Sequence, residues 1–192
     1  MHAYEIDKAN GDTGWTDSMQ KEINEVMSYE TFKVIPDGVP TPKGYKRIPY
    51  HMVFAAKFDQ RKKSRLVAGG HRSPMVHSED AHASVVSMEA VRLGFVMAKL
   101  NGLQVCAGDI GNAYLNAYTD EKLYIIAGPE FGPKLAGKRL IVIRALYGTR
   151  TAGAKFHQLT TTFFKKLGFT PSKADPDLLM KKHPDGHYEH IA

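Results

Sequence analysis

The chain has 192 residues, 43% of them hydrophobic and 24% charged, so it is long enough to bury a core and its composition excludes a disordered protein. Its 26 lysines and arginines exceed its 20 acidic residues, and the resulting charge of +6 favours a polyanionic partner. A single cysteine, Cys106, excludes an internal disulfide and lies in an apolar run, which predicts a small core residue in a reducing compartment. Without a membrane-spanning stretch or a signal-peptide pattern, we expect an intracellular protein, cytoplasmic or nuclear.

A helix and a strand are predicted near the amino end. Residues 1–14 carry little pattern, and we expect them to be loosely ordered. From residue 16 or 17 onward, apolar side chains recur at helical spacing, and the acidic residues of the first turns suit the helix dipole. The apolar face holds Trp15, Met19, Ile23, Val26 and Met27, and the opposite face holds Asp17, Lys21, Glu22 and Glu25. A strand is expected over 31–35, followed by a loop rich in proline and glycine over 36–44.

Residues 45–68 predict a β-hairpin with a basic tip. The β-branched and aromatic residues over 45–58 indicate a strand, in which Pro49 marks an edge or a bulge. A polar turn over 59–63 leads into a second strand over 64–68. The cations of this hairpin are Lys57, Arg61, Lys62, Lys63 and Arg65, against Asp59 alone. Such a run of charge is most often a solvated loop.

The middle of the chain predicts a capped helix and a buried strand. After an irregular polar stretch over 71–84, Ser87 is expected to cap a helix over 88–100 that turns Val91, Phe95 and Ala98 toward the core. The apolar run that follows, over 103–109, stops at a carboxylate and reads as a strand leading into a turn. Asp109 at its end either contributes to a site or closes a turn, and composition alone favours the turn.

The last part of the chain alternates strands and a helix. Strands are predicted over 122–127 and 139–144, because both segments are rich in β-branched residues. A helix is expected over 149–167 with Gly168 as its C-cap. A final hairpin joins 177–182 to 188–191 around a Pro-Asp-Gly turn.

Three blocks occur in a fixed order: KSRLVAGGH from Lys63, VCAGDIGNAYL from Val105 and RALYGTRTAG from Arg144. In this order they resemble the reverse transcriptase domain of Ty1/copia-type retrotransposons. The corresponding blocks of that family read roughly K-A-R-L-V-A-x-G, D-[IV]-x-x-A-[FY]-L and A-L-Y-G-L-K-x-[AS]-[PG]. The resemblance covers about residues 15–192, and Thr149 departs from the leucine of the family.

The resemblance implies an α+β fold. A polymerase palm, mainly an antiparallel sheet backed by helices, is expected over about 85–192 and is incomplete at the C-terminus. A β-hairpin fingers subdomain is expected over about 30–84. The partners implied are an RNA/DNA template-primer and deoxynucleoside triphosphates, with no membrane, together with the remaining palm, thumb and RNase H portions of a polyprotein.

The resemblance also implies a role for single residues. Asp109 is expected to be the catalytic carboxylate that binds Mg²⁺, an ion that prefers oxygen ligands, with the Ile110 carbonyl completing its coordination. In the fingers hairpin, Lys63 and Arg65 are expected to bind the triphosphate.

Further roles are implied around the sugar and the phosphates. Asn112 and Ala113 would offer backbone N–H groups to the triphosphate. The ring of Tyr114 would lie under the sugar and exclude a 2′-hydroxyl, and Gly148 would keep the wall beside the nucleotide thin.

Two further metal-binding carboxylates of the family lie in an aromatic-x-Asp-Asp turn, which is expected just after a strand ending like 188–191, past Ala192. We therefore expect a fragment of an RNA-directed DNA polymerase that does not polymerise by itself. The alternative is a non-catalytic basic nucleic-acid-binding module derived from the same fold. A weaker alternative is a structural domain without a nucleic-acid role.

Overall fold

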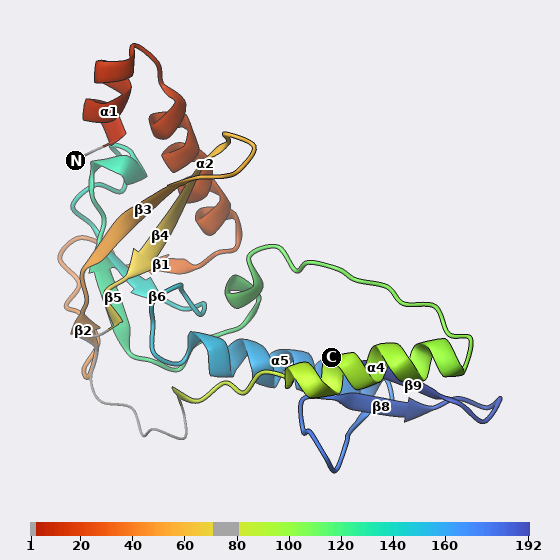
Figure 1. Cartoon of the computed structure of the whole chain (residues 1–192). Coiled ribbons are helices and arrows are strands. Elements are labelled where there is room, and N and C mark those ends of the chain that lie inside the picture. Colours follow the sequence, from red (N-terminus) through yellow and green to blue (C-terminus); the bar gives the residue numbers. More distant parts are fainter. Residues whose placement is uncertain (1–2, 71–80) are drawn as a thin grey trace.

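The structure, a computed structural model, describes residues 3–70 and 81–192, and its mixed helices and sheets form an α+β fold (Figure 1). Of the irregular polar stretch predicted over 71–84, residues 71–80 lie outside the described residues. Among the residues that are described, none of the helices is both long and apolar enough to cross a membrane.

Two helices lie at the amino end, α1 (Ala3–Asn10) and α2 (Gly14–Ser28). Residues 3–10 are thus helical, whereas the sequence predicted a loosely ordered segment over 1–14. The physical reason is the buried side chain of Asp7, whose two oxygens accept hydrogen bonds from Trp15 N at 2.9 Å and Thr16 N at 2.7 Å. A side chain of α1 thus satisfies two of the backbone donors at the start of α2 that the hydrogen bonds within the helix leave without a partner.

Helix α2 packs its apolar face as predicted, with Met19, Ile23 and Val26 buried. The prediction is wrong for Glu22, which was assigned to the polar face but is only 4% exposed. Glu22 is buried because its Oε1 accepts a hydrogen bond from Leu66 N at 3.1 Å, in a strand that lies on this helix. The carboxylate therefore fixes the β-hairpin to α2.

The central sheet has the strand order β1-β6-β5-β2. Its strands are β1 (Phe32–Val34), β2 (Lys46–Arg47), β5 (Leu123–Ile126) and β6 (Arg139–Val142), with the turns η2 (Ala113–Asn116) and η3 (Pro129–Phe131) beside β5 in the sequence. The pairs β1–β6 and β5–β6 are antiparallel, and β2–β5 is parallel.

Pro49 divides the strand predicted over 45–58. The part before it is β2, and the part after it is β3 (Tyr50–Ala56), which pairs antiparallel with β4 (Lys62–Ala68) in a separate two-stranded sheet. The division follows from the missing N–H of proline, which cannot donate to a sheet. One apolar core joins both sheets to α2 and includes Ile23, Val26, Ile48, Leu66, Leu115, Leu123, Ile125, Leu140 and Leu146.

The remaining elements form an arm on one side of this core (Figure 1). They are α4 (Met88–Leu100), α5 (Ala152–Lys166), β7 (Thr170–Pro171), β8 (Leu179–Lys182) and β9 (Tyr188–Ile191), and the strands form an antiparallel sheet in the order β7-β8-β9. The predicted Ser87 cap is confirmed, because its side chain accepts a hydrogen bond from Ala90 N. The predicted burial of Phe95 is wrong: its side chain is 56% exposed, and only the small residues Ala90 and Ala98 of α4 are buried.

The strand predicted over 103–109 is not formed. These residues follow an extended path from the end of α4 back toward η2 (Figure 1), and Val105 is 57% exposed. Cys106 is likewise exposed, so its prediction as a core residue is wrong. An apolar run becomes a strand only when another strand pairs with its backbone groups, and no strand of the described ranges 3–70 and 81–192 does so.

Candidate nucleotide site

The end of β4 and the turn at Gly148 are in backbone contact. Ala68 N donates a hydrogen bond to Tyr147 O at 2.7 Å. Gly148 has a φ of +86°, and a Cβ at this position would lie 2.2 Å from Ala68 O. A Cβ at Gly70 would lie 1.9 Å from Gly148 O. Since nothing larger than glycine fits at either position, the first and third sequence blocks are fixed against each other.

The side chains of β4 alternate between the core and the site. Ser64, Leu66 and Ala68 are buried on the side of α2, and Arg65 is exposed on the other side with Lys63 half-buried beside it. Because neighbouring residues of a strand point to opposite faces, a shift of the pairing by one residue would place Lys63 and Arg65 on the core side; the observed pairing does not. Lys63 and Arg65 share the face away from the core.

A continuous set of ring contacts runs from β4 to α5. The Cζ atom of Arg65 lies 5.6 Å from the ring centroid of Tyr147. The Tyr147 ring lies 4.9 Å from that of Tyr114, and the Tyr114 ring lies 6.1 Å from that of Phe156 in α5. The fold therefore brings together the three sequence blocks, which contribute Arg65, Tyr114 and Tyr147.

Tyr114 is positioned by the short turn η2. Asn112 precedes the turn in the left-handed region, with a φ of 49°, and its carbonyl accepts a hydrogen bond from Leu115 N at 2.9 Å. Leu115 is fully buried and anchors the turn in the core. The backbone N–H groups of Asn112 and Ala113, which the sequence analysis assigned to the triphosphate, lie at the beginning of this turn.

The charge of Asp109 reaches this cluster. Burial raises the pKa of the Tyr147 hydroxyl, the positive charge of Arg65 lowers it, and the carboxylates of Glu22 and Asp109 raise it. Burial likewise raises the pKa of Glu22, against the hydrogen bond from Leu66 N and the nearby cation Lys63. The site therefore contains an exposed cation and two carboxylates within electrostatic reach of one tyrosine.

Asp109 itself is exposed, as is the neighbouring Ile110 at 53%. No residue of the described ranges forms a hydrogen bond or a salt bridge with its carboxylate, and it belongs to no group of three or more potential metal ligands among them. A single unpartnered carboxylate fits a hydrated divalent ion that keeps most of its waters, as Mg²⁺ does, but it does not complete a two-metal site.

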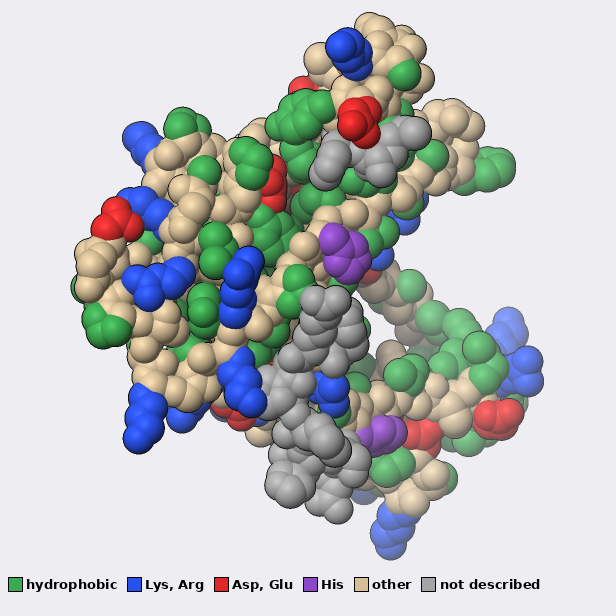
Figure 2. Space-filling model, turned by 90° about the vertical axis from the view of Figure 1, so that its left-hand side faces the viewer, with side chains coloured by type: hydrophobic (Ala, Val, Ile, Leu, Met, Phe, Trp, Pro, Cys, Tyr) green, Lys and Arg blue, Asp and Glu red, His purple; other side chains and the backbone are tan. Residues whose placement is uncertain are grey.

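The surface of the molecule is rich in positive charge. Figure 2 shows a face on which lysine and arginine side chains outnumber acidic ones, consistent with the net charge of +6. A basic face raises the local concentration of polyanions such as nucleic acids.

The chain belongs to the reverse transcriptase (RNA-dependent DNA polymerase) family, whose model matches residues 29–189. More particularly, it is similar to copia-type Pol polyproteins. It is 26% identical over 180 residues to the retrovirus-related Pol polyprotein from transposon TNT 1-94 of Nicotiana tabacum, covering 89% of this chain and 13% of that protein. It is 24% identical to those from transposons RE2 and RE1 of Arabidopsis thaliana, covering 90% and 88% of this chain and 12% of each relative. No solved structure matches.

These relatives define the chain as a reverse transcriptase domain of the copia type, and it spans about one eighth of their length. The family uses divalent metal ions, which agrees with a carboxylate at the site. Glu22, which supports the hairpin from the side of α2, was predicted on the polar face of its helix. Its position gave a signal, because Glu22 shares helical spacing with Met19, Ile23 and Val26.

Proposed function

We propose that residues 15–192 provide the fingers, over about 30–84, and part of the palm, over about 85–192, of an RNA-directed DNA polymerase. The observation that carries the proposal is the chain of contacts from Arg65 to Tyr147 and from Tyr147 to Tyr114, three residues that come from three separate blocks. Templated DNA synthesis then belongs to the complete domain, with the remaining palm, thumb and RNase H portions of the polyprotein as partners.

In this proposal the incoming deoxynucleoside triphosphate lies between the hairpin and η2. Arg65 binds phosphate oxygens through its planar guanidinium, which offers parallel donors, and Lys63 adds a second positive charge on the same face. The half-buried ring of Tyr147 lies beside Arg65 and restrains the guanidinium over its surface. The exposed position of Arg65 leaves its donors accessible to phosphate oxygens.

Tyr114 selects the sugar. Its ring is held between Tyr147 and Phe156, so it cannot move away from a ligand without breaking aromatic contacts. A 2′-hydroxyl that meets this ring is excluded sterically, and the site therefore takes deoxynucleotides. The backbone N–H groups of Asn112 and Ala113 bind the triphosphate, and Gly148, whose lack of a side chain lets the turn pack on Ala68, forms part of the wall beside the nucleotide.

Asp109 holds Mg²⁺ through its carboxylate, with the Ile110 carbonyl as a further oxygen ligand. The ion would activate the primer hydroxyl and neutralise the pyrophosphate leaving group when bound. Asp109 suits this role because it is exposed and because its oxygens are not engaged by any described cation. The template-primer is an RNA/DNA duplex whose phosphates meet the basic surface.

Calorimetry tests this proposal. It measures the binding of dTTP to the full chain in the presence and in the absence of Mg²⁺. We expect Mg²⁺ to strengthen binding and Asp109→Asn to weaken Mg²⁺-dependent binding roughly tenfold, equivalent to about 1.4 kcal/mol. The matched control is Asp37→Asn, since the Asp37 side chain is 83% exposed and pairs only loosely with Lys138 at 3.7 Å.

Two outcomes would contradict the proposal. Binding that is independent of Mg²⁺, or that Asp109→Asn leaves unchanged, removes the metal role of Asp109. A chain that binds an RNA–DNA duplex with a steep salt dependence but does not bind Mg²⁺·dTTP is the non-catalytic nucleic-acid-binding module instead.

A further inference from the structure

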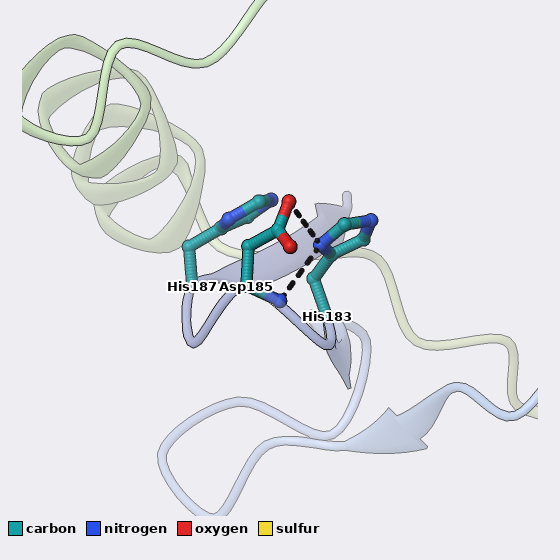
Figure 3. A group of neighbouring side chains, drawn as sticks. All are labelled: His183, Asp185 and His187. Atoms are coloured by element: carbon teal, nitrogen blue, oxygen red, sulfur yellow. Dashed lines mark hydrogen bonds and ion pairs between the residues drawn. The ribbon is translucent and has the colours of Figure 1, made fainter.

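The turn between β8 and β9 presents two histidines and an aspartate on one side of the hairpin. Its sequence is His183-Pro184-Asp185-Gly186-His187, and Figure 3 shows His183, Asp185 and His187 projecting side by side. Two backbone hydrogen bonds close the turn, from His183 N to His187 O at 2.8 Å and from Gly186 N to His183 O at 3.0 Å. The backbone therefore fixes the starting points of all three side chains.

The side chains already lie at ligand spacing. His183 Nδ1 is 3.3 Å from Asp185 Oδ2, and the two imidazole rings are stacked with their centroids 4.5 Å apart and 16° between their planes. One ligand atom from each residue lies within 4.8 Å of the other two. A tetrahedral zinc ion with bonds of about 2.0–2.2 Å separates its ligand atoms by roughly 3.3–3.5 Å. His183 and Asp185 thus match this separation, and a rotation of the His187 side chain completes the set.

We propose that this turn binds a zinc ion through His183, Asp185 and His187, with water as the fourth ligand. Two imidazole nitrogens and one carboxylate oxygen suit Zn²⁺, whereas Mg²⁺ prefers oxygen ligands alone. Among the residues that the structure describes, this is the one group of three or more histidine, cysteine, aspartate and glutamate side chains arranged to hold a metal. The site is distinct in chemistry from the single carboxylate of Asp109.

The surroundings of the turn allow the ion to enter. Asp185 is exposed, with 76% of its side chain accessible, and the two histidines are half-buried. His183 Nδ1 accepts a hydrogen bond from Asp185 N at 3.2 Å, so its lone pair is available in this tautomer, and a zinc ion at this nitrogen would take the place of that hydrogen bond. Of the two preceding lysines, Lys181 lies 3.9 Å from the carboxylate of Glu189, which offsets part of its charge.

Pro-Asp-Gly forms turns without any histidine beside it, so turn formation does not account for an imidazole at each end. A metal does account for both, because it would link the end of β8 to the beginning of β9. We therefore expect zinc to stabilise the β7-β8-β9 sheet, in addition to binding at the turn.

Titration of the full chain with ZnCl₂, followed by calorimetry, tests the inference. We expect His183→Ala and His187→Ala each to weaken zinc binding roughly tenfold or more, and Asp185→Asn to weaken it less, because a carboxamide oxygen retains a donor without the charge. His190→Ala is the matched control: it removes an imidazole from β9 at a residue paired with Met180, outside the cluster, and should leave the affinity unchanged.

A second readout needs no variant. In ¹H–¹³C NMR spectra of the wild-type chain, zinc should shift the ring signals of His183 and His187 and leave those of His51 and His157 in place. Absence of zinc binding at roughly 100 μM, a concentration at which ordinary protein zinc sites are saturated, would overturn the inference. So would an equal loss in His190→Ala, or zinc shifts confined to other histidines.

Discussion

The guanidinium of Arg65 lies over the ring of Tyr147, with 5.6 Å between its Cζ atom and the ring centroid, and this contact joins the β3–β4 hairpin to the turn before Gly148. The rear of the same hairpin is fixed to α2 by the hydrogen bond from Leu66 N to Glu22. Because its backbone is held from both sides, the hairpin presents the guanidinium in a defined direction. Such preorganisation reduces the entropy lost when a ligand binds.

Substitution of Arg65 should therefore weaken triphosphate binding. We expect Arg65→Ala to lower the affinity for Mg²⁺·dTTP roughly tenfold and Arg65→Lys to have an intermediate effect, since lysine keeps the charge and loses the planar fork. The control is Arg61→Ala, which removes the same charge from the hairpin tip, where Arg61 pairs with Asp59. Calorimetry measures the affinity of the three variants for Mg²⁺·dTTP. An equal loss in Arg61→Ala would show that Arg65 contributes only its positive charge and no specific contact with the phosphates.

Gly148 should be essential for stability. In Gly148→Ala a Cβ meets Ala68 O in addition to a φ of +86°, and we expect the free energy of unfolding to fall by about 3 kcal/mol or more. Gly137 has a similar φ of +80° with open space around it, so Gly137→Ala should cost only about 1–2 kcal/mol. Urea unfolding of both variants separates the steric contact from the backbone strain, and equal losses would contradict the close packing of β4 on this turn.

Asp7 should make the chain sensitive to acid. Although burial raises its pKa, the hydrogen bonds from Thr16 and Trp15 lower it, to about 2 from the ordinary 3.8. A lowered pKa in the folded state gives stability that is present above pH 3.8 and is lost as the pH falls toward 2. Asp7→Asn should be less stable at pH 7 and lose less on acidification. Thermal unfolding from pH 7 to pH 2 measures this, and Asp37→Asn should behave like the wild type.

Glu22 should have the opposite dependence on pH. Burial raises its pKa above the ordinary 4.5, so the folded chain binds a proton more tightly than the unfolded chain. Its contribution to stability is therefore greatest below pH 4.5 and decreases as the pH rises through the raised pKa. Glu22→Gln keeps an acceptor for Leu66 N and removes the buried charge, so it should be more stable than the wild type at pH 8 and lack this decrease.

The exposed Glu30→Gln is the control for Glu22, because it lies just after the same helix and should leave the pH profile unaltered. Chemical unfolding of the wild type and both variants between pH 4 and pH 8 is the measurement. A Glu22→Gln variant with the same profile as the wild type would show that Glu22 keeps its ordinary acidity in the fold.

Elements that depend on neighbours in sequence could be predicted. The hairpin predicted over 45–68 is one of them, because its strands are joined by a polar turn and pair with each other. Its first strand was predicted as continuous over 45–58, with Pro49 as an edge or a bulge, whereas the structure divides it at Pro49. The strands β5 and β6 were recognised from their β-branched residues. Tyr114 and Asp109 could be assigned only through the family resemblance, since a lone carboxylate more often closes a turn.

Features that depend on distant partners could not be predicted. The run over 103–109 has the composition of a buried strand, but strand formation requires a partner that local sequence does not specify. Cys106 and Phe95 were expected in the core because they are apolar. Apolar character indicates a tendency to be buried, but it does not identify which other part of the chain would cover the residue. Glu22 shares helical spacing with buried residues of α2, but its burial also depends on a backbone donor in the hairpin, Leu66 N, which the sequence of α2 alone does not reveal.

The most direct test of the central claim is photo-cross-linking of a photoreactive deoxynucleoside triphosphate to the full chain in the presence of Mg²⁺, with the adducts located by peptide mapping. If Asp109, Tyr114 and Arg65 surround one nucleotide, adducts should map to peptides containing Arg65, Tyr114 or Tyr147 and should decrease in Asp109→Asn. Adducts confined to other basic segments, or equal labelling without Mg²⁺ and in Asp109→Asn, would contradict the account.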